Sequence, residues 1–296
     1  MPPENITPEI WFPNLNIYFT RVPQVAFSIF GLDIYWYAIF IVTGITAAYL
    51  LGIWYVKKTG QRVEDYTDLL LLGIPLAVVG LRAYYLIFNW GRYSGQPILS
   101  VIFNIRGGGL AIYGGIIGAI LAGVIIAKVK KIPFTTIADV AAPSLLIGQV
   151  IGRFGNFFNR EAFGGYTDGL FAMRIQLDQA RGVRPDLLET AVVEYNGMQY
   201  LQVHPTFLYE AFFNLLLMIA LLIYRPHKRF EGEIILMYML GYGIIRFFVE
   251  GLRTDQLIFF GTGLPASQVM SVVFVVLSLA LIIAGRVFKA GQSRKK

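Results

Sequence analysis

The sequence of 296 residues contains no cysteine. The chain therefore forms no disulfide, holds no metal through thiolates and has no cysteine nucleophile. Any thiol that takes part in its chemistry must belong to a substrate. The other polar residues show no metal-ligand spacing, and we expect neither a metal nor another cofactor.

Charged residues are also scarce. They make up 15% of the chain against 56% for hydrophobic residues, which is far from the balance of a soluble domain. The composition indicates a protein that crosses a membrane several times. The net charge of +7 does not indicate a nucleic-acid partner, because every lysine lies in a short segment beside an apolar run, where basic residues set topology. The N-terminus lacks a basic region followed by a short apolar one, so we expect no cleaved signal.

Seven apolar runs are long enough to cross a bilayer as helices. They cover residues 34–56, 68–88, 110–127, 137–158, 206–224, 234–252 and 266–285. Basic residues follow the first, third, fifth and seventh runs, which places those ends in the cytoplasm. We predict an all-α polytopic membrane protein with seven transmembrane helices, its N-terminus outside and its C-terminus inside.

The rest of the chain is predicted to divide around these helices. We expect an external segment at 1–33, helices one to four at 34–158, a small external α+β head at 159–205, helices five to seven at 206–286, and a basic cytoplasmic tail at 287–296. Within the head, Asn196-Gly197 separates two strand-like runs and predicts a two-residue hairpin turn. No internal repeat is evident, which counts against transporter folds built from duplicated halves.

Ionisable residues occur inside only some of the predicted helices. Apart from tyrosines, and from Asp68 and Asp139 in the first turns of helices two and four, there are five: Arg82 in helix two, Arg153 in helix four, Glu210 in helix five, and Arg246 and Glu250 in helix six. Such side chains need a polar interior to face. The helix directions put them all in the outer half of the membrane, together with Tyr37 and Tyr113, so we expect one polar cavity open to the outside.

Two of these helices carry polar stripes. Tyr242, Arg246, Glu250 and Arg253 recur at helical steps, as do Arg153, Asn156 and Arg160. Arginine suits a phosphate held by two donors, so Arg153 and Arg246 predict a clamp for a phospholipid headgroup. The alternative is that Arg246 and Glu250 only pair to hold helices together. The neighbouring Asn156, Asn159 and Glu161 favour a site over that alternative.

Two side chains near the start of helix five have alternative interpretations. His204, where the head meets the helix, either orients the site or only caps the helix. Tyr209 is either an aromatic anchor at the membrane interface or a hydrogen-bond partner in the site.

Three motifs appear in order along the chain. They are Gly152-Arg153-Phe154-Gly155-Asn156-Phe157-Phe158-Asn159-Arg160-Glu161-Ala162-Phe163-Gly164-Gly165, then His204-Pro205-Thr206-Phe207-Leu208-Tyr209-Glu210, then Gly241-Tyr242-Gly243-Ile244-Ile245-Arg246-Phe247-Phe248-Val249-Glu250. Together they resemble the prolipoprotein diacylglyceryl transferases of bacterial inner membranes, and matching features extend from Tyr37 to Glu250.

The resemblance implies a reaction. The diacylglyceryl group of phosphatidylglycerol would pass to the thiol of the lipobox cysteine in a preprolipoprotein signal peptide, forming a thioether and releasing glycerol phosphate. The partners would be phosphatidylglycerol, these signal peptides and the lipid bilayer. The protein would lie in the bacterial plasma membrane, with its site toward the outer leaflet.

The resemblance also assigns residues. Arg153 would bind phosphatidylglycerol, Arg246 would be a second essential arginine, and the site would be lined by Asn156, Glu161, Gly164, Tyr37, Tyr242 and Glu250. To the substrate-binding set we add Asn159, Glu210, Tyr209, Tyr113 and Arg82. Two positions depart from the family pattern, since Tyr113 stands where many members have His and Arg160 replaces the more usual Gly or Gln. The first departure counts against a histidine base at that position.

Three residues are candidates for the base that deprotonates the substrate thiol, namely Glu161, Glu210 and His204. Tyr113 is a weak candidate because an ordinary phenol titrates near pKa ~10.

Two other classes of function compete with the transferase interpretation. A lipid or solute transporter needs charge along a path through the bilayer, but the inner halves of helices four, five and six read as apolar. A membrane hydrolase would consume the same phospholipid without a thiol acceptor.

Overall fold

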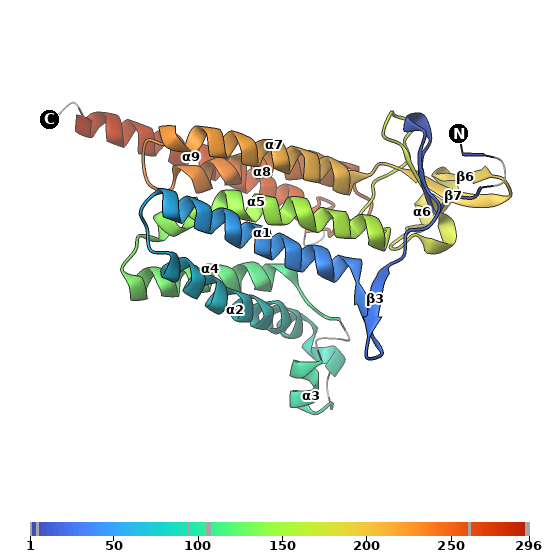
Figure 1. The fold of residues 1–296 in the computed structure, drawn as a ribbon, viewed down its shortest axis with the longest axis horizontal. Helices are drawn as coiled ribbons and strands as arrows, with labels where there is room; N and C mark the ends of the chain where they lie inside the picture. The colour runs from blue at the N-terminus through green and yellow to red at the C-terminus, as the bar shows by residue number, and fades with distance from the viewer. Residues whose placement is uncertain (1, 4–5, 94, 105–107, 260–261, 294–296) are drawn as a thin grey trace. The chain divides into compact units, whose positions relative to one another are not determined.

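The structure is a computed structural model that describes residues 2–3, 6–93, 95–104, 108–259 and 262–293. Within these ranges seven helices are long and apolar enough to cross a membrane, as the sequence predicts (Figure 1). They are α1 (Trp36–Lys58), α2 (Val63–Asn89), α4 (Ile112–Lys130), α5 (Phe134–Asn159), α7 (Thr206–Tyr224), α8 (Glu233–Leu252) and α9 (Ala266–Ser293). Two short helices, α3 (Ile98–Phe103) and α6 (Pro185–Thr190), lie in the connections.

Charged residues mark several helix ends. α1 finishes on Lys57 and Lys58, and α2 begins with Glu64 and Asp65 in its first turn. Both placements suit the helix dipole, which favours cations at the C-terminal end and anions at the N-terminal end. At the last helix, α9 continues past Gly285 to Ser293, so most of the predicted tail at 287–296 is helical, and residues 294–296 lie outside the described residues.

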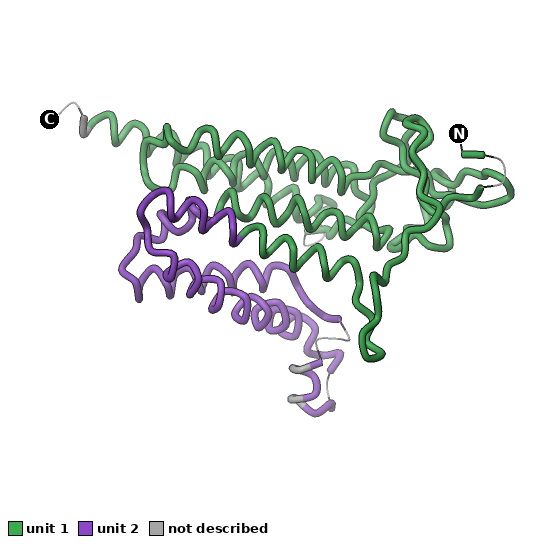
Figure 2. Tube along the Cα trace, viewed as in Figure 1, with its two compact units in different colours: residues 1–48, 142–296 green, residues 49–141 purple. Residues whose placement is uncertain are grey.

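The chain forms two compact units (Figure 2). Unit 2 contains residues 49–141, and unit 1 contains residues 1–48 and 142–296. The division passes through α1 and α5. In unit 2, α2 and α4 pack with their backbones in contact, because a side chain at Gly114 would collide with the backbone of Gly80. Small residues allow this close approach in membrane helices, where van der Waals packing drives association.

The head in unit 1 is a five-stranded antiparallel sheet of order β2-β1-β5-β7-β6. Its strands are β1 (Ile10–Phe12), β2 (Ile17–Phe19), β5 (Met173–Gln176), β6 (Val192–Tyr195) and β7 (Met198–Val203). The predicted hairpin at Asn196-Gly197 joins β6 to β7, with φ of 51° and 72° as a type I′ turn requires. The head thus includes two strands from the N-terminal segment, which the sequence-based boundary at 159–205 leaves out.

The core of the head lies against the start of α7. It contains Ile10, Met173, Ile175, Leu201 and Phe207, each at most 1% exposed. Phe207 belongs to the first turn of α7, so the sheet and this helix share one core. That shared core fixes the residues just before and after Phe207, including His204 and Glu210, relative to the head.

A separate two-stranded hairpin lies between the head strands and the first long helix. β3 (Val25–Ile29) pairs with β4 (Leu32–Tyr35), and α1 begins at the next residue, Trp36. The backbone amide of Trp36 donates to the carbonyl of Gln24, which joins the base of the hairpin to the helix start.

Candidate active site

Three helices of unit 1 meet at one buried carboxylate. Glu210, on α7, is 1% exposed and accepts from Arg153 of α5 at 2.5 Å (Nη2 to Oε1) and from Arg246 of α8 at 3.1 Å (Nη1 to Oε2). Such charge-assisted bonds are about twice as strong as neutral ones. The two arginines predicted to act together therefore do share one environment, and Glu210 is the group that they share.

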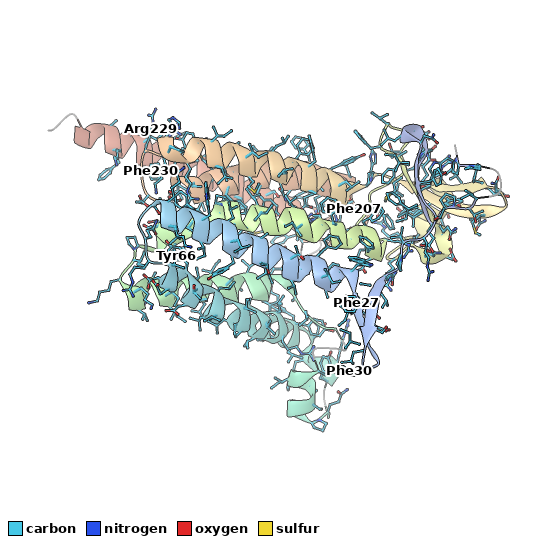
Figure 3. All side chains as sticks on the ribbon, in the orientation of Figure 1. Phe27, Phe30, Tyr66, Phe207, Arg229 and Phe230 are labelled. Carbon is cyan, nitrogen blue, oxygen red and sulfur yellow. The ribbon has the colours of Figure 1, made fainter. Side chains whose placement is uncertain are left out.

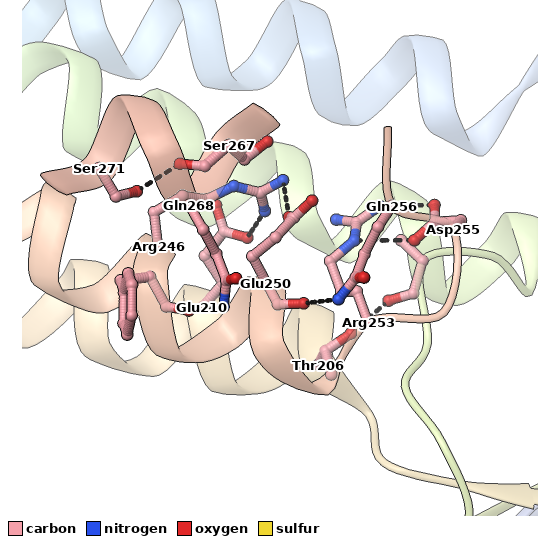
Figure 4. Close-up of polar contacts among 12 residues, drawn as sticks. Thr206, Glu210, Arg246, Glu250, Arg253, Asp255, Gln256, Ser267, Gln268 and Ser271 are labelled. Carbon is pink, nitrogen blue, oxygen red and sulfur yellow. Dashed lines mark hydrogen bonds and ion pairs between the residues drawn. The ribbon is translucent and has the colours of Figure 1, made fainter. Parts of the chain in front are cut away.

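Arg246 also pairs with a second carboxylate on its own helix. Its Nη2 lies 2.5 Å from Oε2 of Glu250, one turn further along α8 (Figure 4). Glu250 is itself buried, and its backbone carbonyl accepts from Gln256. Two arginines and two glutamates balance to zero formal charge, which allows the cluster to lie among membrane helices. We call Arg153, Glu210, Arg246 and Glu250 the ion cluster.

A polar pocket of about 260 Å³ opens beside Arg153. Its lining comes from the end of α5, the loop after it, a loop of the head and the chain that follows α8. The lining residues are Arg153, Asn156, Glu161, Ala162, Phe163, Arg181, Gly182, Arg253, Thr254 and Asp255. Arg153 belongs to both the ion cluster and the pocket, so it connects the buried charges to a space that a ligand can enter.

Glu161 is held within this pocket by two amides. The side chains of Asn156 and Asn159 both donate to its Oε1, each at 3.0 Å. On either side of it, Arg160 and Ala162 have positive φ values of 54° and 57°, which side chains other than glycine adopt at a cost. Strained backbone of this kind gathers at functional sites, and here it ends α5 and turns Glu161 toward the pocket.

Gly155 brings Tyr37 close to this region. A Cβ at Gly155 would come within 2.7 Å of Cδ2 of the Tyr37 ring, so only glycine permits the contact. Tyr37 lies near enough to Glu161 and Arg153 to interact with their charges. The second residue of α1 thereby adjoins the site formed by α5.

Gly164 lies behind the pocket, where three chain segments meet. Its amide donates to the carbonyl of His204 at 2.8 Å, and a Cβ there would come within 2.5 Å of the Leu252 carbonyl oxygen and 2.9 Å of Cγ2 of Thr206. Thr206 in turn donates to the carbonyl of Ala162 at 2.7 Å. The structure thus gives Gly164 a backbone role that holds the loop after α5 against the ends of α7 and α8.

The imidazole of His204 is directed at a tyrosine. Nδ1 lies 3.3 Å from the hydroxyl of Tyr209, and His204 is not among the described residues that line the pocket. Burial lowers the pKa of His204, so its ring is neutral at pH 7. His204 and Tyr209 therefore contact each other beside the site, and neither faces the pocket directly.

A layer of uncharged polar side chains underlies the ion cluster. Tyr242 hydrogen-bonds Glu210 and stacks on Tyr238, with ring centroids 5.6 Å apart and planes at 5°. Gln149 donates to the Tyr238 hydroxyl at 2.9 Å and accepts from Asn214 at 3.3 Å. Gln149 and Asn214 lie one turn from Arg153 and Glu210 on their own helices, so the layer follows the cluster across α5, α7 and α8.

Two of the predicted substrate-binding residues belong to unit 2. Arg82 is 5% exposed, and its guanidinium donates to the carbonyls of Val101, Gly108 and Gly109, which holds the connection between α3 and α4. Tyr113 lies near the start of α4, and its ring centroid is 6.2 Å from the ring centroid of Tyr84. Each thus has partners within its own unit.

Sequence reasoning missed several residues of the site. Arg181 has no motif around it, but it lines the pocket, and its backbone amide donates to the carbonyl of Arg160, just after α5, at 3.0 Å. Arg253 appears in the helix-six stripe, but its partner Asp255, at 2.7 Å, does not. Burial alone would raise the pKa of the Asp255 carboxyl, but the hydrogen bonds and charge of Arg253 hold it below its usual range.

Arg160, which departs from the family pattern, binds the N-terminal segment. Its Nη2 lies 2.6 Å from Glu9 and 2.5 Å from the carbonyl of Val22, and the Glu9 carboxylate also accepts from the amide of Val22. This ion pair, buried at its Arg160 end, ties residues 9 and 22 to the end of α5, directly before Glu161.

Comparison with known proteins decides the family. A family model described as prolipoprotein diacylglyceryl transferase matches residues 24–284. The chain belongs to the prolipoprotein diacylglyceryl transferase family. It is 42% identical over 280 residues to proteins of Bacillus cytotoxicus, Bacillus cereus and Bacillus anthracis named phosphatidylglycerol–prolipoprotein diacylglyceryl transferase, an alignment covering 93% of this chain and 96% of each relative. The family match includes every residue of the ion cluster and of the pocket lining.

Proposed function

We propose that this chain transfers the diacylglyceryl group of phosphatidylglycerol to the cysteine thiol of a preprolipoprotein signal peptide. The sulfur forms a bond to the glyceryl carbon, the bond between that carbon and the phosphate oxygen breaks, and glycerol phosphate leaves with the electron pair. A base takes the thiol proton. Family membership supports this reaction, and the observation that carries it in the structure is Arg153, held by buried Glu210 and lining a polar pocket at the end of the membrane-spanning helix α5.

Arg153 is the residue proposed to meet the phosphate. It lines the pocket, and its guanidinium can offer a second edge to an anion while the first stays on Glu210. Arg246 reaches the same carboxylate from α8 and so supports the position of Arg153 from the far side. Charge grows on the phosphate as the bond breaks, and guanidinium groups fixed in advance stabilise that charge in the transition state.

Glu161 is proposed as the base. It lines the pocket, and two amides fix one of its oxygens. Of the other candidates, Glu210 has an arginine on each oxygen and His204 is directed at Tyr209. A base must lie within hydrogen-bond reach of the proton it takes, and the pocket geometry favours Glu161 on that criterion.

For orientation in the membrane, we propose that the N-terminus and head lie outside and the C-terminus lies inside a bacterial plasma membrane. Lysines lie in the last turns of α1 and α4, and basic residues of this kind stay on the cytoplasmic side. The pocket then opens toward the outer leaflet, where both the lipid headgroup and a signal peptide are available.

The test uses the purified protein in detergent with labelled phosphatidylglycerol and a cysteine-bearing signal peptide. We expect lipidated peptide and glycerol phosphate in equal amounts, and neither product with a peptide whose cysteine is replaced by serine. Lipid consumed without lipidated peptide would instead indicate a hydrolase, and no turnover of lipid at all would be the result expected of a transporter.

Arg153→Lys keeps the charge but loses the planar fork, so we expect transferase activity to fall at least tenfold. Arg62→Lys, at an exposed ion pair of 4.0 Å, is the matched control.

A further inference from the structure

The β3–β4 hairpin has one apolar and one polar face. In its register Phe27 pairs with Ile34 and Ile29 pairs with Leu32, whereas Ser28 pairs with Asp33. Paired residues lie on the same side of a two-stranded sheet. Ser28 donates to Asp33 at 2.6 Å and closes the polar face. The sequence thus gives the hairpin an amphipathic pattern of period two.

The apolar face is uncovered in unit 1. Phe27 and Ile29 are each 49% exposed and Leu32 is 55% exposed. At the tip, Phe30 is fully exposed and has φ of 51°, followed by Gly31 at 75° (Figure 3). A large aromatic residue at such a backbone angle costs free energy, and full exposure of its ring to water costs more. A two-stranded hairpin is also marginal in water by itself. Contiguous apolar surface of this kind marks an interaction site.

The position of the hairpin identifies the partner. β4 ends at Tyr35 and α1 begins at Trp36, so the apolar face continues directly into a membrane-spanning helix. Side chains in the first turns of that helix, such as Val42 at 64% exposed, form a lipid-facing surface. Tyr35, Trp36 and Tyr37 at the junction match the aromatic belt found where helices enter the headgroup region.

We propose that the β3–β4 hairpin is a membrane-interface element that inserts Phe27, Ile29, Phe30 and Leu32 among the acyl chains of the leaflet where α1 begins. Ser28 and Asp33 face the headgroups and water. The only formal charge between Val25 and Tyr35 is Asp33, which lies on the polar face, so no charge opposes insertion of the other face.

This placement sets the depth of the active site. Tyr37 is two residues from the hairpin, about 3 Å along the axis of α1 at the usual helical rise, and it contacts Gly155 beside the pocket. The pocket would then lie at headgroup level. If the proposed function holds, a phospholipid reaches Arg153 without leaving its leaflet.

The absence of cysteine makes the test direct. A nitroxide label is attached to Phe30→Cys and, separately, to Phe27→Cys, with Gln199→Cys at the exposed start of β7 in the head as the matched control. Each protein is placed in vesicles of phosphatidylethanolamine and phosphatidylglycerol, and collision rates with oxygen and with a water-soluble nickel chelate are measured by electron paramagnetic resonance. At positions 30 and 27 we expect oxygen to dominate by at least threefold, and at position 199 the chelate.

Two results would overturn the proposal. Chelate accessibility at position 30 equal to that at 199 would place the hairpin in water. Low accessibility to both reagents, with an immobilised spectrum, would mean that a second copy or another protein covers the hairpin.

Transferase activity of each labelled protein is measured in parallel. An inactive protein with a lipid-exposed label contradicts the proposed function alone, and an active one with a water-exposed label contradicts the hairpin proposal alone.

Discussion

The substitution Glu210→Gln tests the ion cluster at its centre. Glutamine has nearly the shape of glutamate, but it is neutral and presents one carbonyl oxygen and one NH₂ group. Its oxygen can still accept from one arginine, whereas the NH₂ group faces the other. In the wild-type structure each oxygen of Glu210 serves a different arginine, at 2.5 Å for Arg153 and 3.1 Å for Arg246. The substitution therefore removes one bond and weakens the other.

The expected loss of activity can be worked out from these two hydrogen bonds. A hydrogen bond to a charged group contributes about 1.5–3 kcal/mol, and its neutral counterpart about half of that. Losing one bond and half of the other costs about 2.3–4.5 kcal/mol. If this free energy is lost from the transition state, kcat/KM falls about 40- to 1600-fold, at about 1.4 kcal/mol per factor of ten. Glu250→Gln breaks one contact only and leaves Arg246 on Glu210, so we expect a fall of about tenfold.

The assay measures kcat/KM for peptide lipidation beside the thermal unfolding midpoint in detergent. Glu233→Gln is the matched control, because Glu233 is equally buried and binds Arg286 at 2.8 Å at the other end of α8. It should lower the unfolding midpoint without changing kcat/KM of the folded protein. The reasoning is refuted if Glu210→Gln keeps kcat/KM within threefold of wild type, or if Glu233→Gln loses as much activity as Glu210→Gln does.

Three further predictions concern the residues around the pocket. Glu161→Gln should reduce kcat by at least a hundredfold and abolish the acidic limb of the pH–rate profile; an unchanged profile would exclude Glu161 as the base. His204→Asn should keep that limb. Because the pKa of His204 lies below its unfolded value, protonation favours unfolding, so His204 stabilises the fold above pH ~6.5. The wild-type unfolding midpoint should fall as pH drops through the folded pKa, and more steeply than that of His204→Asn; parallel curves would contradict this. Gly164→Ala should cost about 1–3 kcal/mol by overpacking against Leu252 and Thr206. A melting temperature within 1 °C of wild type would show that the backbone is free to move.

Much of this architecture could be predicted because hydrocarbon limits what a sequence can place within it. Long apolar runs have one stable form in a bilayer, so the seven helices follow from run length alone. The same physics singles out Arg153, Glu210 and Arg246, since charges in such helices must find one another. The alternating directions of α5, α7 and α8 give the three residues a similar depth, and their meeting at Glu210 is consistent with that depth.

Other parts depend on contacts between distant segments and leave no local pattern. β1 pairs with β5 across more than half the chain, and nothing near Ile10 indicates that partner. Arg160 could be recognised as a departure from the family pattern, but its ion pair with Glu9 joins residues 151 positions apart. Pocket residues such as Arg181 fall in the same class. Local periodicity predicts elements and their faces, whereas loop-to-loop contacts appear only when the fold is complete.

The polar layer under the ion cluster bears on the choice between an enzyme and a transporter. Gln149, Asn214 and Tyr238 are uncharged, and they bond one another within α5, α7 and α8. Beyond Asn214, α7 continues from Leu215 to Ile223 with apolar side chains only. A transport path needs polar groups that continue to the opposite face, because an ion or headgroup without partners in hydrocarbon costs several kcal/mol. On α7 the polar positions stop one turn below the charges. A site closed on that side holds its ligand where the arginines are, which suits a reaction and opposes passage.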